Sequence, residues 1–263
     1  MEAYEFGTEN SRRILLIPGN LMSWRQFEDV IPLLSEKYHV IAISTDGYDG
    51  TGKTTFTTSR ASAASVEEYL KGKMYDRLSL VFGESFGCAT AAVMFQNQNI
   101  RIDSMILSGA QYMSFGILNV FFKSYVPNQQ YRLLGKMKST TKVPWMLKAF
   151  ARSNDANMLK MFRAAAENVS LETLQNCTNE ALHLYEDIAG FDKRPDAKVA
   201  VWHGAKEPNM KKAVTAIRKI YPSAEDCSFE GLGHGDIIGE PERMAMEIER
   251  FFGDRSINNK KRA

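Results

Sequence analysis

Continuous apolar runs alternate with helical patterns along this chain, and that alternation limits the folds open to it. The runs are rich in aliphatic and β-branched residues and cover 13–17, 40–44, 78–82, 104–107, 199–202 and, more weakly, 227–229. Strands that are apolar throughout, instead of in alternation, are covered on both faces. The pattern therefore predicts an α/β fold with a mostly parallel, doubly wound sheet and helices on both faces.

The segments between the runs carry apolar residues at helical spacing. They predict helices over 23–38, 60–70, 85–96, 210–220 and 241–252. In sheets of this kind, ligands bind outside the carboxyl ends of the strands. Polar side chains that directly follow a predicted strand are therefore the first candidates for a functional site.

The alternation stops over residues 112–190, which contain no convincing strand and are dense in methionine and aromatic residues. This insertion begins directly after the strand that ends at Ser108 and Gly109. It predicts a helical cap over the strand ends, and the alternative is a helical layer that only covers the sheet. The chain then divides into a core, 1–111 and 191–263, and a cap, 112–190.

The strongest local motif is Gly83-Glu84-Ser85-Phe86-Gly87, which lies between a predicted strand and a predicted helix. A sharp turn in this setting holds a serine in a strained backbone and presents its hydroxyl above the sheet edge. Glycine is required on both sides because a Cβ there would strike a neighbouring strand or helix. Ser85 is therefore the candidate nucleophile, and the alternative is an ordinary turn serine.

A serine nucleophile needs a base, and the base needs an acid that orients it. Of the four histidines, His234 lies in a glycine-rich loop after the last predicted strand, which lets its ring approach other loops. Glu207 lies on the loop past the strand that ends at Trp202 and is the candidate acid. Asp236 is a rival acid, although it is only two residues from His234 and is expected to cap the next helix.

Acyl transfer also needs backbone donors for the oxyanion. The amide of Phe86 is the first candidate, and the amide of Asn20 or Leu21, in the loop after the first predicted strand, is the second. Two preorganised amides contribute about 3 kcal/mol each to transition-state stabilisation.

Together these residues resemble the α/β-hydrolase superfamily over most of the chain. The Pro18-Gly19 loop, the serine turn, the segment that ends at Glu207 and the Gly233-His234 loop occur in the family's order. The resemblance implies Ser85 as nucleophile, His234 as base and Glu207 as acid, with a cap after the sixth strand. Two features depart from the usual pattern, because many members have His-Gly in the first loop and most have aspartate as the acid.

Composition and charge favour a soluble globular protein that binds neither nucleic acid nor a membrane. The net charge is +2, which gives no long-range field for nucleic acid or an anionic membrane surface. No apolar stretch reaches membrane-spanning length, and the first residues show no signal peptide. The three cysteines are widely spaced and predict neither a disulfide framework nor a metal site. We therefore expect a cytoplasmic protein with no cofactor and no metal.

A second motif, Gly47-Tyr48-Asp49-Gly50-Thr51-Gly52-Lys53-Thr54, satisfies the phosphate-loop pattern. Poor helix formers follow Lys53, and Asp49 would lie inside the anion cradle. A nucleotide-binding protein is thus an alternative function, as is a hydrolase-fold lyase, a cofactor-free peroxidase or a non-catalytic binding protein.

These features favour a serine hydrolase that cleaves an ester or related acyl bond through a Ser-His-Glu triad and an acyl-enzyme. The start of the cap suggests an apolar substrate, and the candidate substrate-binding residues are Met113, Phe115, Phe121 and Phe122.

Overall fold

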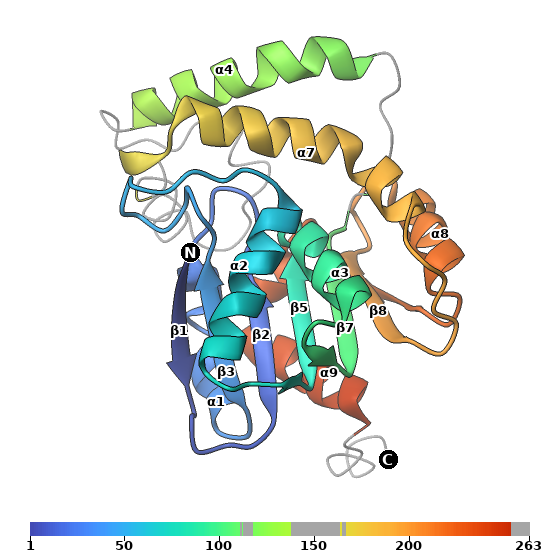
Figure 1. Ribbon diagram of the computed structural model, residues 1–263. Coiled ribbons are helices and arrows are strands. Elements are labelled where there is room, and N and C mark those ends of the chain that lie inside the picture. Colours follow the sequence, from blue (N-terminus) through green and yellow to red (C-terminus); the bar gives the residue numbers. More distant parts are fainter. Residues whose placement is uncertain (111, 113–117, 138–163, 165–166, 254–263) are drawn as a thin grey trace.

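The computed structural model of the chain describes residues 1–110, 112, 118–137, 164 and 167–253. Within this part, the main sheet has the spatial order β1 (Glu2–Phe6), β3 (His39–Ser44), β2 (Arg13–Ile17), β5 (Leu80–Glu84), β7 (Ser104–Ser108), β8 (Lys198–Gly204) and β9 (Glu225–Phe229). Only β1 is antiparallel to its neighbour, and the other neighbouring pairs are parallel (Figure 1). A small separate ladder pairs β4 (Arg77–Leu78) with β6 (Arg101–Ile102). The predicted mostly parallel sheet is confirmed.

Helices cover both faces of this sheet: α2 (Ser59–Gly72), α3 (Gly87–Asn97) and α8 (Met210–Ile220) cover one face, and α1 (Ile31–Ser35) and α9 (Pro241–Phe252) cover the other. The remaining helices of the described part are η1 (Trp24–Phe27), α4 (Asn119–Met137), α7 (Leu171–Ala189) and η3 (Asp236–Gly239). Strand residues alternate between two cores: Leu15 and Ile17 pack with α2, α3 and α8, whereas Ile14 and Leu16 pack with α1 and α9. Covering on both faces explains why the strands are apolar throughout.

The single helix predicted over 23–38 is wrong. The chain forms the short helix η1, a turn, and then α1, with Pro32 in the first turn of α1. Proline has no N–H to donate, and its ring would clash with the carbonyl of Glu28 in a continuous helix. Apolar spacing alone therefore could not carry the helix through this position.

Strand β1 has no counterpart among the predicted strands. It contains two glutamates, Glu2 and Glu5, and all five of its residues are only partly buried. It pairs at the sheet edge, where Glu5 accepts hydrogen bonds from Tyr69 and Tyr75 and lies beside the ring of His39. Burial opposes the charge of Glu5, but these partners and Lys73 outweigh it and lower the pKa of this carboxyl to about 2.

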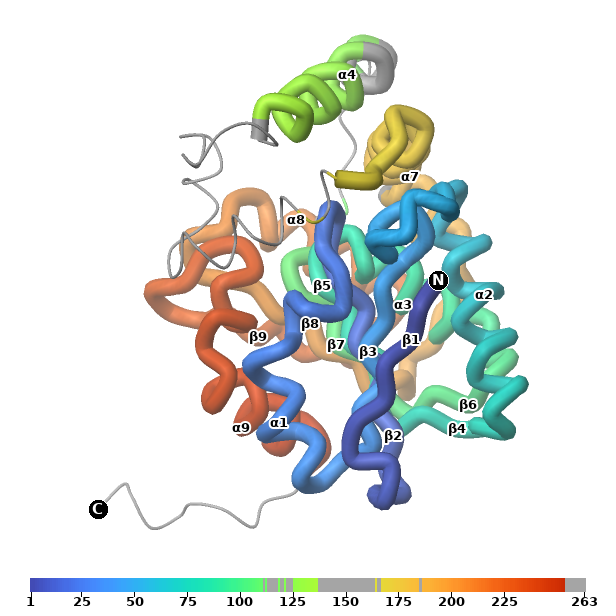
Figure 2. The backbone as a smooth tube through the Cα atoms, turned by 90° about the vertical axis from the view of Figure 1, so that its left-hand side faces the viewer, coloured from blue at the N-terminus to red at the C-terminus, as the bar shows by residue number. Residues whose placement is uncertain are grey.

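The described part of the predicted cap consists mainly of two long helices. α4 and α7 pack side by side and lie across the carboxyl ends of the parallel strands (Figures 1 and 2). Three residues of α4 and α7 form an apolar cluster with the core residues Tyr48 and Phe56: Leu134, Leu174 and Cys177. This end of the sheet is where the predicted site residues lie.

Candidate active site

Ser85 occupies a strained turn between β5 and α3. Its φ is 50°, a left-handed conformation that is uncommon for residues other than glycine. Its amide donates to the carbonyl of Ser108 on the neighbouring strand at 2.7 Å. A Cβ on Gly83 would lie 2.8 Å from the Cα of Cys88, and one on Gly87 would lie 2.5 Å from the carbonyl oxygen of Pro18. The steric reason for both glycines is confirmed.

His234 and Glu207 reach Ser85 from two further loops. His234 Nε2 lies 2.9 Å from Ser85 Oγ, and His234 Nδ1 lies 2.5 Å from Glu207 Oε1. A Cβ on Gly204 would lie 2.3 Å from the carbonyl oxygen of Leu232, so glycine at this position lets the two loops approach each other. The structure brings the three predicted triad residues together in one hydrogen-bonded row.

Carboxylates around His234 favour its charged form. Burial lowers the pKa of the imidazole, but the hydrogen bond to Glu207 and the negative charges of Glu84, Glu207 and Asp236 outweigh burial and raise it. The Glu207 side chain is 1% exposed and that of His234 is 27% exposed. This arrangement can take a proton from Ser85 and stabilise the resulting imidazolium.

The rival acid, Asp236, does not contact the ring nitrogens of His234. Its carboxylate accepts the amide N–H of Gly233 at 2.7 Å at the start of η3. Asp236 therefore shapes the loop that carries His234 and adds a negative charge near it. The prediction that Asp236 caps the next helix is wrong, because Gly235 is the N-cap residue of η3 and Glu240 that of α9.

The loop after β2 lies against the nucleophile. A Cβ on Gly19 would lie 3.4 Å from Ser85 Cβ, and the amide of Gly19 already donates to Gln26 Oε1 at 2.9 Å. The amides of Phe86, Asn20 and Leu21 have no acceptor within the described part of the chain. These three amides are therefore the candidates for an oxyanion site.

Two side chains that hold this loop were missed by the sequence reasoning. Gln26 fixes Gly19, and the Tyr48 hydroxyl donates to Asn20 Oδ1 at 2.7 Å. Gln26 lies in no recognisable motif, and Tyr48 occupies a variable position of the phosphate-loop pattern. Both residues lie near the end of a predicted strand, but position in the sequence does not identify a hydrogen-bond partner.

The predicted substrate-binding residues have mixed outcomes. Met113 and Phe115 lie outside the described residues, as does the side chain of Phe122 on α4. Phe121 is 59% exposed and stacks on Tyr125. The described apolar cluster beside the site consists of other residues: Tyr48, Phe56, Leu134, Val169, Leu174 and Cys177. Leu21, Met22 and Phe86 pack against this cluster from the core.

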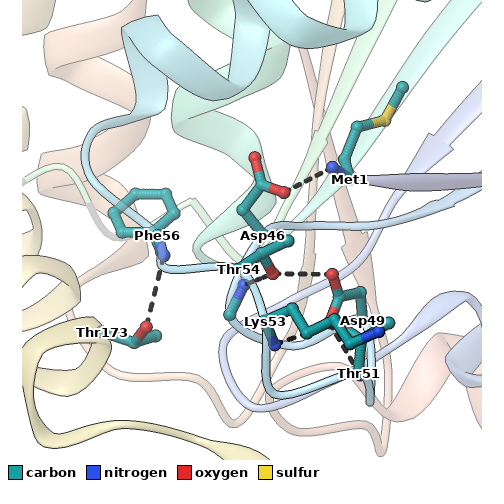
Figure 3. A network of polar contacts seen from close by, with 9 residues as sticks. Met1, Asp46, Asp49, Thr51, Lys53, Thr54, Phe56 and Thr173 are labelled. Carbon is teal, nitrogen blue, oxygen red and sulfur yellow. Dashed lines mark hydrogen bonds and ion pairs between the residues drawn. The ribbon is translucent and has the colours of Figure 1, made fainter.

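The phosphate-loop pattern folds around a carboxylate of its own. Asp49 accepts hydrogen bonds from the amide and hydroxyl of Thr51, each at 2.9 Å, and from the hydroxyl of Thr54 at 2.6 Å (Figure 3). The loop opens no helix, because α2 begins only at Ser59. Donors satisfied by an internal anion do not form a phosphate cradle, so this geometry disfavours the nucleotide-binding alternative.

Among the described residues, no three His, Cys, Asp or Glu side chains gather as metal ligands would. No helix in this part of the chain has the length and apolarity needed to cross a bilayer.

Comparison with known proteins identifies the fold family. The family model described as the alpha/beta hydrolase fold matches residues 12–241. No curated protein sequence matches the chain.

Several solved structures are similar throughout. An α/β-hydrolase family protein from Desulfitobacterium hafniense has a TM-score of 0.75 at 20% identity, over 95% of this chain and 99% of that one. A bromoperoxidase from Bacillus anthracis has a TM-score of 0.73 at 19% identity, over 96% and 95%. A thermophilic esterase from Thermogutta terrifontis has a TM-score of 0.71 at 13% identity, over 96% and 93%. At such identities the likeness shows the shared fold and leaves the reaction open.

Proposed function

The chain belongs to the α/β-hydrolase family, and on that premise we propose that it is a serine hydrolase that cleaves an ester or related acyl bond. The observation that carries the proposal is the row from Ser85 through His234 to Glu207, with Ser85 at a φ of 50°. Neither the fold nor the packing requires a strained serine, a histidine and a buried carboxylate in this order. Nucleophilic catalysis by an alcohol does require it.

The proposed reaction has two halves. His234 accepts the Ser85 proton as Oγ attacks the acyl carbon, and then gives that proton to the leaving alcohol as the bond to it breaks. Water attacks the acyl-enzyme in the second half, with His234 again taking and returning a proton. Glu207 holds the Nδ1–H of the ring and balances the imidazolium charge.

The amides of Phe86 and of Asn20 or Leu21 bind the carbonyl oxygen as its negative charge develops in the proposed reaction. Gln26 and Tyr48 hold the second loop in place, so these donors need little rearrangement when charge forms. The side chain of Gly19 is a hydrogen atom, which leaves the space above Ser85 open.

A fluorophosphonate probe tests the nucleophile. We expect covalent modification of Ser85, located by peptide mapping, because the probe traps serines activated by a neighbouring base. His234→Ala should label at least about a hundredfold more slowly, since it removes that base. Cys88, buried in the first turn of α3 and three residues after Ser85, is an internal comparison and should remain unmodified. Labelling at another serine, or none at all, would contradict the proposed function.

An apolar acyl group is the substrate class that we propose. Met22 packs against the apolar cluster from the loop that abuts Ser85. Each additional buried methylene contributes about 0.8 kcal/mol. We therefore expect kcat/KM for a hexanoate ester to exceed that for the acetate ester by about tenfold or more.

Met22→Ala should lower kcat/KM for the hexanoate ester more than for the acetate ester. Met246→Ala, on the exposed face of α9, is the matched control and should leave the ratio unchanged. Faster cleavage of the acetate ester by the unaltered protein would rule out an apolar acyl site.

A further inference from the structure

Glu84, the residue before the nucleophile, is a buried carboxyl group that the triad does not use. It is 1% exposed at the end of β5. Within the described part of the chain, neither of its carboxyl oxygens has a hydrogen-bond partner of good geometry. Burying a carboxyl without partners is costly. A leucine or methionine could occupy a similar volume without that cost, so packing alone does not explain an acid here.

The Glu84 carboxyl lies beside the ring of His234. A Cβ on Gly109 would lie 3.3 Å from Glu84 Oε1 and also 2.7 Å from His234 Cε1 and 3.0 Å from His234 Nδ1. A Cβ on Gly235 would lie 3.2 Å from the same Oε1. Both glycines have positive φ, 64° and 72°. Two residues without side chains therefore leave room for a carboxyl group and an imidazole to lie next to each other.

The charges around the two groups are coupled. Burial raises the pKa of Glu84 to about 7, the charge of His234 and the Ser108 hydroxyl lower it, and the charge of Glu207 raises it further. Glu84 in turn helps to raise the pKa of His234. The other titratable groups that face this pair are Glu207, Asp236 and the thiol of Cys88, whose own pKa burial raises well above its usual range. The thiol therefore stays neutral.

We propose that Glu84 is a positioning residue that acts through His234, with its carboxylate supplying a second negative charge beside the imidazolium that forms when Ser85 gives up its proton. The inference rests on the proposed function and deepens it. Glu207 holds the ring through Nδ1, and Glu84 acts on the same ring by charge alone. Full activity then requires two coupled groups to lose their protons, one from Glu84 and one from His234.

The test is the pH dependence of kcat/KM for an uncharged ester, followed by pH-stat between pH 5 and 9. In the unaltered protein, we expect the acidic limb of log kcat/KM to rise with a slope greater than one. In Glu84→Gln, the slope should fall to one, and the plateau should begin at lower pH, because removing the negative neighbour lowers the pKa of His234. The plateau itself should fall about tenfold, since the imidazolium loses a stabilising charge.

Control variants separate charge from packing. Glu67→Gln removes the charge of another buried glutamate, which lies in α2 and accepts a hydrogen bond from Asn99 at 2.7 Å, and should leave the acidic limb unchanged. Glu84→Asp keeps a carboxyl group at this position, so the acidic limb of log kcat/KM should keep a slope greater than one. A Glu84→Gln protein with a lower plateau but an unchanged slope and midpoint would overturn the inference and leave a structural role.

A measurement on the unaltered protein does not depend on whether a variant folds. The ring nitrogens of His234, followed by NMR against pH, should titrate in two coupled steps, and a single-step curve would overturn the inference. Fluorophosphonate labelling distinguishes a failure of the proposed function from a failure of the role of Glu84. If Ser85 is not labelled, the proposed function fails and this inference falls with it. If Ser85 is labelled with the same pH dependence in both proteins, only the inference fails.

Discussion

Replacing Ser85 with alanine is expected to lower kcat for ester cleavage by about 10⁴- to 10⁶-fold. The change removes the oxygen that attacks the acyl carbon and leaves His234 without a proton to accept. The affinity for the ester should change little, because the proposed oxyanion amides and the apolar cluster remain. The measurement is steady-state kinetics with a hexanoate ester, together with loss of fluorophosphonate labelling.

Ser62→Ala is the matched control for this change. Ser62 is buried in α2, away from the triad, and alanine is favoured in a helix. Its kcat should stay within about twofold of that of the unaltered protein. Turnover by Ser85→Ala within about tenfold of normal would show that another group performs the chemistry.

Glu207→Gln is expected to lower kcat by about 10³- to 10⁴-fold with the fold intact. Glutamine has nearly the same shape, but it is neutral and can present an N–H to the ring, which favours the wrong tautomer of His234. The imidazolium also loses the carboxylate that lies 2.5 Å from Nδ1. Steady-state kinetics measure the fall in kcat, and a thermal melt on the same preparation checks that the fold is intact.

Asp236→Asn tests the rival acid. Asparagine keeps an oxygen that can accept the amide of Gly233, so the loop should hold its shape. We expect a fall in kcat of about tenfold or less, from the loss of one nearby charge. If Asp236→Asn were the more damaging of the two variants, the acid would be misassigned.

The architecture of the core was predictable from local pattern. Strands buried on both faces need unbroken apolar runs, and α8 and α9 begin and end at the predicted residues. The apolar pattern gave wrong or missing elements where a single proline, or pairing at the sheet edge, decided the secondary structure. Pro32 divides the predicted first helix into η1 and α1, and β1 is recognisable only once it pairs with β3.

The site was predictable only in part, for a related reason. Ser85 stands out because a Cβ on Gly83 or Gly87 would clash with the backbone, and His234 stands out because it lies between two glycines in the loop after the last strand. Glu207 and Asp236 are both plausible acids by position, and only the distance from Nδ1 separates them. Gln26 lies in no motif, and Tyr48 and Glu84 occupy variable positions of motifs. The roles of these three residues depend on contacts with residues far away in the chain, so the sequence does not reveal them.

Amino-acid order by itself therefore determined the layers, the strained serine turn and the loops that follow the strands. Those features follow from apolar periodicity and from where glycine is tolerated, and both are local properties. Only the tertiary structure decided which carboxylate meets the imidazole and which amides remain without acceptors. It also showed that the Gly47–Thr54 loop is occupied by the carboxylate of Asp49. Such outcomes depend on contacts between distant segments, and hydrogen bonds form only where folding brings a donor within about 3 Å of an acceptor.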